Sequence, residues 1–150
     1  MKPKLMHFFV YSSVLVLILT SMAKIISSSG SAPILEMSDP VFNISYRVVF
    51  LVVAGIELII AGICAFTNRI WLQVGLLSWL ATCFIAYRLD LKFAGIRYCP
   101  CLGTVVDSLP ISRNTADSIL LLIVVYLTIG GYASLLWLYW QTRKLAVLKS

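Results

Sequence analysis

Two cysteines separated by a single proline are the residues whose spacing most directly suggests chemistry. In Cys99-Pro100-Cys101, the two thiols can form a disulfide, but the small ring is strained, and strain makes it easier to reduce. The spacing therefore predicts a redox-active pair suited to thiol–disulfide exchange. Two other interpretations stay open: a soft-metal site that uses both thiolates, and two loop cysteines without a role. Two ligands do not complete a zinc site, which usually has four, so we predict no metal.

An acidic residue inside an apolar run is the second candidate for chemistry. Glu57 stands at the centre of the run 48–66, and a charged acid at mid-bilayer costs roughly 2.5 kcal/mol or more. We expect it to be neutral, or hydrogen-bonded inside the protein. It could handle a proton or contact a quinone; the alternative is a structural hydrogen bond to a neighbouring helix. Lys24 could be its partner, but its place near the end of its own run favours extension to the outer interface.

The remaining cysteines lie within apolar runs. We expect Cys64 and Cys83 to be buried and to behave as small hydrophobic residues. Cys64 follows Glu57 by about two helical turns, so the two share a helix face. That arrangement could extend a path inward from Glu57.

The elements that position these residues are four apolar runs. The chain is 61% hydrophobic and 12% charged, whereas soluble domains carry about 25% charged residues. Each run is close to the ~20 residues that cross a bilayer as a helix. We therefore predict an all-α, four-helix transmembrane bundle, a single integral membrane domain over residues 1–150. Its expected helices are 8–26, 48–66, 70–87 and 119–140, with a tight turn at 67–69 and long connections at 27–47 and 88–118.

Charge placement suggests an orientation in the membrane. Four spans put both termini on one side, and the basic residues divide evenly between the two sides. The compact basic groups at 2–4 and 143–149 flank the first and last runs directly, so we expect cytoplasmic termini and outward-facing long connections. The basic residues form no stripe, which indicates membrane topology rather than nucleic-acid binding. The first run also resembles a secretory signal ending in Ser21-Met22-Ala23, an alternative in which it would be cleaved.

The order of these features resembles a known group of membrane proteins. Lys24 ends the first run, Glu57 lies in the second, Cys99-Pro100-Cys101-Leu102-Gly103 follows the third, and Arg113-Asn114 precedes the fourth. This order is similar to the DoxX-like superfamily, and within it to the methylamine utilisation protein MauE and its redox-associated relatives. The resemblance covers nearly the whole chain, and Cys-x-Cys-x-Gly is its most specific part. Leu102 stands where the family usually has Phe, and 104–111 also differs from the MauE pattern.

The resemblance implies a four-helix bundle in a bacterial inner membrane that acts beside a thioredoxin-like partner. We therefore expect a redox-associated protein in which Cys99 and Cys101 take part in thiol–disulfide exchange with that extracytoplasmic partner. Such exchange would support disulfide formation or maturation of a periplasmic enzyme, with Glu57 as the intramembrane acid and a quinone as the cofactor it could contact. The alternative is a non-enzymatic membrane subunit or small transporter with Glu57 in its permeation path and incidental cysteines.

Overall fold

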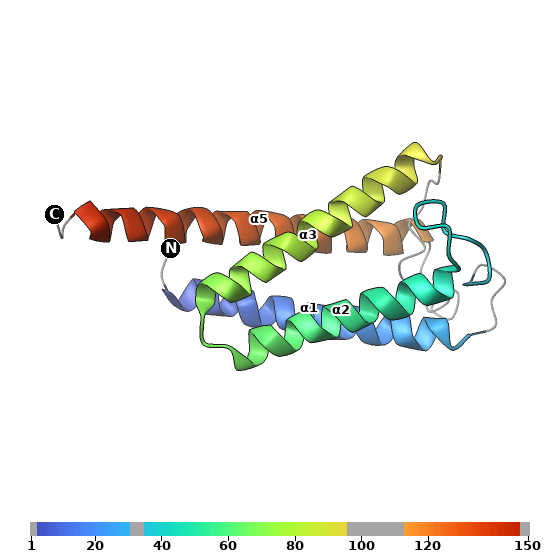
Figure 1. Cartoon of the computed structure of the whole chain (residues 1–150), viewed down its shortest axis with the longest axis horizontal. Coiled ribbons are helices and arrows are strands. Elements are labelled where there is room, and N and C mark those ends of the chain that lie inside the picture. The colour runs from blue at the N-terminus through green and yellow to red at the C-terminus, as the bar shows by residue number, and fades with distance from the viewer. Residues whose placement is uncertain (1–2, 31–34, 96–112, 148–150) are drawn as a thin grey trace.

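The computed structural model describes residues 3–30, 35–95 and 113–147, and these ranges hold four long helices (Figure 1). They are α1 (Pro3–Ser28), α2 (Tyr46–Phe66), α3 (Ile70–Phe93) and α5 (Arg113–Val147). All four are long and apolar enough to cross a membrane. In the same ranges, β structure is limited to one isolated bridge between Ser38 and Ser45. The prediction of an all-α, four-helix bundle is confirmed.

Large apolar side chains cover the outer surface of the helices. Phe8, Ile59 and Leu122 are each about two-thirds exposed, at 67%, 65% and 68%. In water, such surface would cost about 25 cal/mol per Å², whereas hydrocarbon chains solvate it without that cost. The bundle therefore has the outer surface of a multi-pass membrane protein.

The helices associate as two close pairs. α1 packs along α2 and α3 packs along α5, while contacts between the pairs are sparse. The turn at 67–69 joins α2 to α3, as predicted, and Figure 1 shows α3 diverging from α2 beyond it. A short connection therefore makes α2 and α3 neighbours at the turn only. Both termini lie at the same end of the bundle as this turn (Figure 1), as an even number of spans requires.

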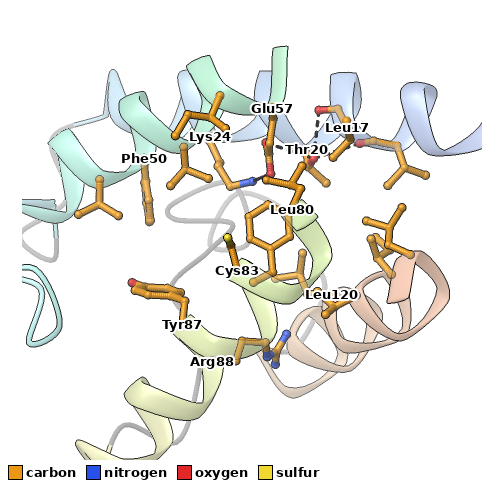
Figure 2. A pocket seen from close by; sticks show the side chains of 18 of the residues that line it. Leu17, Thr20, Lys24, Phe50, Glu57, Leu80, Cys83, Tyr87, Arg88 and Leu120 are labelled. Atoms are coloured by element: carbon orange, nitrogen blue, oxygen red, sulfur yellow. Dashed lines mark hydrogen bonds and ion pairs between the residues drawn. The ribbon is translucent and has the colours of Figure 1, made fainter. Parts of the chain in front are cut away.

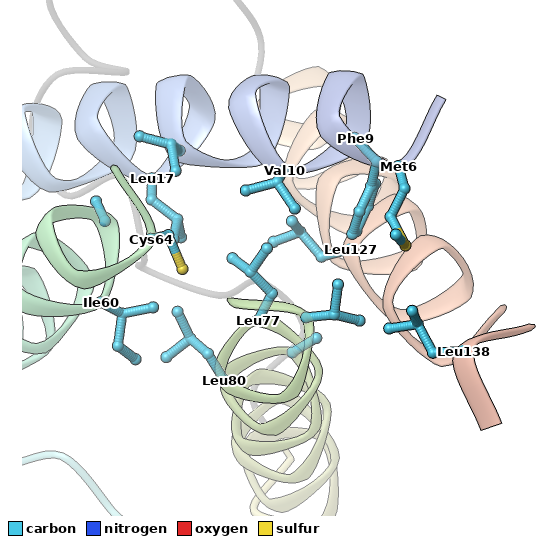
Figure 3. Packing of buried hydrophobic residues seen from close by; sticks show 14 residues of the cluster. Met6, Phe9, Val10, Leu17, Ile60, Cys64, Leu77, Leu80, Leu127 and Leu138 are labelled. Atoms are coloured by element: carbon cyan, nitrogen blue, oxygen red, sulfur yellow. The ribbon is translucent and has the colours of Figure 1, made fainter. Parts of the chain in front are cut away.

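The bundle is closely packed in the half that holds the termini. Side chains from all four helices meet there in one apolar cluster (Figure 3). The members labelled in that view are Met6, Phe9, Val10, Leu17, Ile60, Cys64, Leu77, Leu80, Leu127 and Leu138. On α1 the cluster ends at Leu17, and on α3 it ends at Ala81. Beyond these residues the two helix pairs separate, and the half of the bundle near the long connections is less filled.

Glycines allow close approach in α5 but not in α2. A Cβ on Gly131 would collide with Ser78 of α3, and one on Gly130 would collide with the ring of Phe9. A Cβ on Gly55 or Gly62 would meet nothing. These two glycines of α2 therefore mark no close helix contact, whereas Ala54 and Ala61 of the same helix are buried.

Polar contacts hold the opposite end together. Asp39, fully buried in the connection between α1 and α2, accepts hydrogen bonds from the backbone N–H groups of Val41 and Phe42. It also accepts one from the Tyr87 hydroxyl of α3 at 2.5 Å. Arg88 of α3 forms an ion pair with Asp117 of α5 at 2.5 Å. These contacts tie the first connection to α3, and α3 to α5.

Three helices extend well past their apolar runs, and the first of them, α1, begins at Pro3. α3 continues to Phe93, and α5 begins at Arg113 and reaches Val147, so the connection between them is shorter than the predicted 88–118. Hydropathy marks the part of a helix that lies in hydrocarbon. A helix that leaves the membrane keeps its backbone hydrogen bonds and can continue with polar side chains.

Candidate functional site

Glu57 lies at the centre of a buried polar cluster between α1 and α2. It is in the middle of α2 and only 1% exposed. The Lys24 ammonium lies 2.6 Å from its Oε1 atom. The hydroxyls of Ser21 and Thr20 lie 3.0 Å and 3.4 Å from Oε2. The hydrogen-bonded carboxyl that the sequence predicts is therefore observed (Figure 2).

Helix geometry explains why Lys24 turns inward. The structure contradicts the expectation that it extends to the outer interface, because Lys24 is 7% exposed and paired with Glu57. Side chains on an α-helix lean toward its N-terminus. In α1, that direction leads from Lys24 into the bundle; in the antiparallel α2, it leads from Glu57 toward Lys24. The two side chains therefore lean toward each other.

The hydroxyls beside Glu57 have a second acceptor. Ser21 Oγ also lies 2.6 Å from the Leu17 carbonyl, and Thr20 Oγ1 lies 3.1 Å from the same oxygen. Since each hydroxyl has one proton to donate, it can serve the carboxyl or the backbone without being left unpaired. The Lys24 ammonium also lies 5.7 Å from the centre of the Phe84 ring, within range of a cation–π interaction.

A cavity of about 230 Å³ adjoins this polar cluster. It lies between the two helix pairs, in the half of the bundle beyond the packed core, and its lining is almost entirely apolar (Figure 2). Phe50 of α2 and Phe84 and Tyr87 of α3 give it aromatic walls. Lys24 and Glu57 lie on one side, and Arg88 lies nearer the end of α3. Glu57 is thus a lining residue of a membrane cavity as well as an interhelical contact.

The cysteines divide between core, cavity and the connection. Cys64 is buried, as predicted, and its thiol lies 3.8 Å from the Gln73 carbonyl near the 67–69 turn. Cys83 differs from its prediction, because it is exposed and lines the cavity. Cys64 belongs to the packed core and is not among the cavity's lining residues, so it does not extend the Glu57 site.

The predicted redox pair lies outside the described residues. Cys99 and Cys101 fall in the stretch 96–112, between the end of α3 and the start of α5. Of the predicted site residues, the structure therefore places only Glu57. Within the described residues, no group of three or more His, Cys, Asp or Glu side chains could hold a metal ion.

Sequence reasoning missed Thr20 and Ser21, and it named Lys24 only as the less favoured partner of Glu57. Thr20, Ser21 and Lys24 recur at the three- and four-residue spacing of one helix face, and this polar stripe in an apolar run was the available signal. Cys83 carried no such signal, because only the separation of the helix pairs exposes it to the cavity.

Comparisons with known proteins add no identification. The chain matches no protein-family model, no curated protein and no solved structure. The structure itself describes a multi-pass membrane bundle with a buried Lys–Glu pair beside an apolar cavity.

Proposed function

We propose that this bundle is a component of a thiol–disulfide oxidoreductase in a bacterial inner membrane, exchanging disulfides with an extracytoplasmic thioredoxin-like protein. The observation that carries the proposal is the Cys99-Pro100-Cys101 sequence in the connection between two membrane-spanning helices. The Arg88–Asp117 ion pair joins the two flanking helices, α3 and α5, so the helix ends from which the connection starts are held together. The resemblance to MauE and its redox-associated relatives supports the same role.

The exchange itself needs only the two thiols and a partner. A thiolate of the partner attacks one sulfur of the Cys99–Cys101 disulfide, forming a mixed disulfide and releasing the other cysteine as a thiolate. The partner's second thiol then attacks the mixed disulfide, so the partner becomes oxidised and the pair becomes a dithiol. The strain of the small ring favours this direction, because a strained disulfide is the more oxidising one.

The orientation in the proposal follows from the charges. The terminal basic groups lie in the cytoplasm, so the end of the bundle that carries Asp39, Arg88 and the cysteine connection faces outward. That compartment is oxidising, so an exposed pair of thiols there takes part in disulfide chemistry.

Glu57 serves this role as an intramembrane acid. Its carboxyl has Lys24, Ser21 and Thr20 within reach, and a proton that passes from the Lys24 ammonium to the Glu57 carboxylate leaves both groups uncharged, with no bare charge in the bundle. A transporter with Glu57 in its permeation path is less well supported, because the apolar cluster from Met6 to Leu138 fills the half of the bundle beyond the cavity.

Trapping of a mixed disulfide tests the proposal. The experiment uses cells in which Cys64 and Cys83 are replaced by Ser, so that only the loop pair can react. Cys99→Ser or Cys101→Ser should then produce a partner-sized band shift on a non-reducing gel that reductant removes. The matched control is the variant that lacks both loop cysteines, which should insert normally and show no shift. If neither single variant traps a partner, the exchange role is wrong.

A further inference from the structure

The cavity beside Glu57 is large enough for a ring but small for a whole lipid-soluble molecule. Its volume is about 230 Å³, and an apolar cavity of about 150 Å³ is enough to bind benzene. Sites that enclose a complete ligand usually measure about 300–1,000 Å³. A substituted ring therefore fits inside, and any longer apolar tail would extend into the surrounding bilayer.

The charges on the cavity lining cancel. Its charged lining residues, among those that the structure describes, are Lys24, Glu57 and Arg88. Lys24 is paired with Glu57, and Arg88 is paired with Asp117 just outside the lining. An ionic ligand would enter this apolar space without a free counter-charge, which is costly at membrane depth. The lining therefore selects an uncharged occupant.

Aromatic side chains and the Lys24 ammonium group indicate which chemical groups the ligand in the cavity should carry. Phe50 and Tyr87 face the cavity (Figure 2), and Phe84 also lines it; these rings can pack against a flat ring. An ammonium has three N–H donors, and one contact to Glu57 is described for Lys24. Because Lys24 lines the cavity, its other donors are available to an acceptor oxygen on a ring, whereas an acyl chain would offer no such oxygen.

From these observations, we propose that the cavity between the two helix pairs binds the head group of an isoprenoid quinone or quinol. One ring oxygen accepts a hydrogen bond from Lys24, and the tail lies in the bilayer. Binding itself follows from the cavity and does not need the cysteines. Only its redox consequence rests on the proposed function: the Cys99/Cys101 dithiol gives up two electrons and two protons to form its disulfide, and the quinone takes both to become a quinol.

Two neighbouring valines of α2 provide a matched test of the site. Val53 lines the cavity, whereas Val52 is 53% exposed on the outer surface. The full chain, purified into nanodiscs of bacterial phospholipids, is titrated with decylubiquinone while tryptophan fluorescence is followed; Trp79 lines the cavity and reports binding. Val53→Phe should raise the Kd for decylubiquinone by about tenfold or more, and Val52→Phe should leave this Kd unchanged.

A charge-neutral double variant tests the anchor. Lys24→Met combined with Glu57→Gln removes the ammonium without leaving an unpaired buried charge. It should weaken decylubiquinone binding by about tenfold, with unchanged elution and melting temperature as the check on folding. If it melts early, Cys83→Phe, which fills the cavity from α3 and adds no tryptophan, tests the cavity in its place and should also weaken binding by about tenfold.

Several results would overturn the site. Equal binding by the two valine variants would place the quinone elsewhere, and equally tight binding of a sulfonated quinone would contradict the charge argument. Displacement by phospholipid with the same affinity would show an acyl-chain site instead. The variant without Cys99 and Cys101 separates the two proposals, because quinone binding should persist in it even if thiol exchange is lost.

Discussion

Removing one partner of the Lys24–Glu57 pair should destabilise the bundle far more than removing both. The pair is 2.6 Å apart, and its side chains are 8% and 1% exposed. Glu57→Leu leaves the Lys24 ammonium without its carboxyl, and Lys24→Met leaves the Glu57 carboxyl without its ammonium. Loss of a single partner of a buried ion pair typically costs about 3–5 kcal/mol.

The two single variants should differ in a way set by their positions. Lys24 lies about one turn from the end of α1 at Ser28, so after Glu57→Leu it can swing to the interface. Glu57 is in the middle of α2 and has no such escape. We therefore expect Lys24→Met to be the more damaging change, with Glu57→Leu toward the lower end of the range.

The double variant should recover most of the loss. With both charges replaced by apolar groups of similar volume, the buried site becomes nearly neutral in its effect on stability. Ser21 and Thr20 keep the Leu17 carbonyl as an acceptor, so they add little to the cost. Each single variant loses at least about 3 kcal/mol and the double variant loses little, so the expected coupling energy is about 6 kcal/mol in magnitude.

Reversible unfolding in bicelles, analysed as a double-mutant cycle, measures this coupling. The free energy of unfolding is compared for the wild type, both single variants and the double variant under identical lipid conditions. If the double variant loses as much stability as the two single variants added together, the pair is not coupled. Lys24 would then lie at the interface, as the sequence alone suggested.

Four further variants test other parts of the structure, and the first three use the same unfolding assay. Gly131→Val should lower the free energy of unfolding by about 1–3 kcal/mol because its Cβ collides with Ser78. Gly62→Val, where nothing lies within 4 Å, should change it by at most about 0.5 kcal/mol; equal effects would contradict the α3–α5 packing. Tyr87→Phe should cost about 1–2 kcal/mol through its lost bond to buried Asp39, and an unchanged stability would refute that tie. Glu57→Gln keeps an oxygen acceptor for Lys24, so it should destabilise the bundle less than Glu57→Leu but lose function, whereas near-normal function would leave Glu57 a structural role only.

The fold could be predicted from the sequence because bilayer thickness and backbone hydrogen bonding leave few choices. An apolar run of about 20 residues must be a spanning helix, and three residues at 67–69 allow only a tight turn. Which helices pack closely could not be predicted. Close packing of α5 depends on the contacts of Gly130 with Phe9 and of Gly131 with Ser78. These residues lie far apart in the chain, so the sequence does not indicate that they meet.

The candidate site could be predicted only in part for a similar reason. Glu57 was identifiable because an acid in an apolar run is costly. Its pairing with Lys24 depends on how far α1 and α2 are offset along the membrane normal, which periodicity does not encode. Helical side chains lean toward the N-terminus of their helix, and this rule could have favoured a Lys24–Glu57 pair over an outward-facing Lys24.

The redox state of the loop cysteines in living cells tests the central claim most directly. In a Cys64→Ser, Cys83→Ser background, cells are quenched with acid and free thiols are tagged with a maleimide that shifts the band on a gel, so that only Cys99 and Cys101 are counted. We expect the pair to be a disulfide in respiring cells and to become a tagged dithiol when electron transfer to quinone is blocked. A pair that is a dithiol in respiring cells would contradict the exchange function, and a pair that stays a disulfide when electron transfer to quinone is blocked would contradict only the quinone coupling.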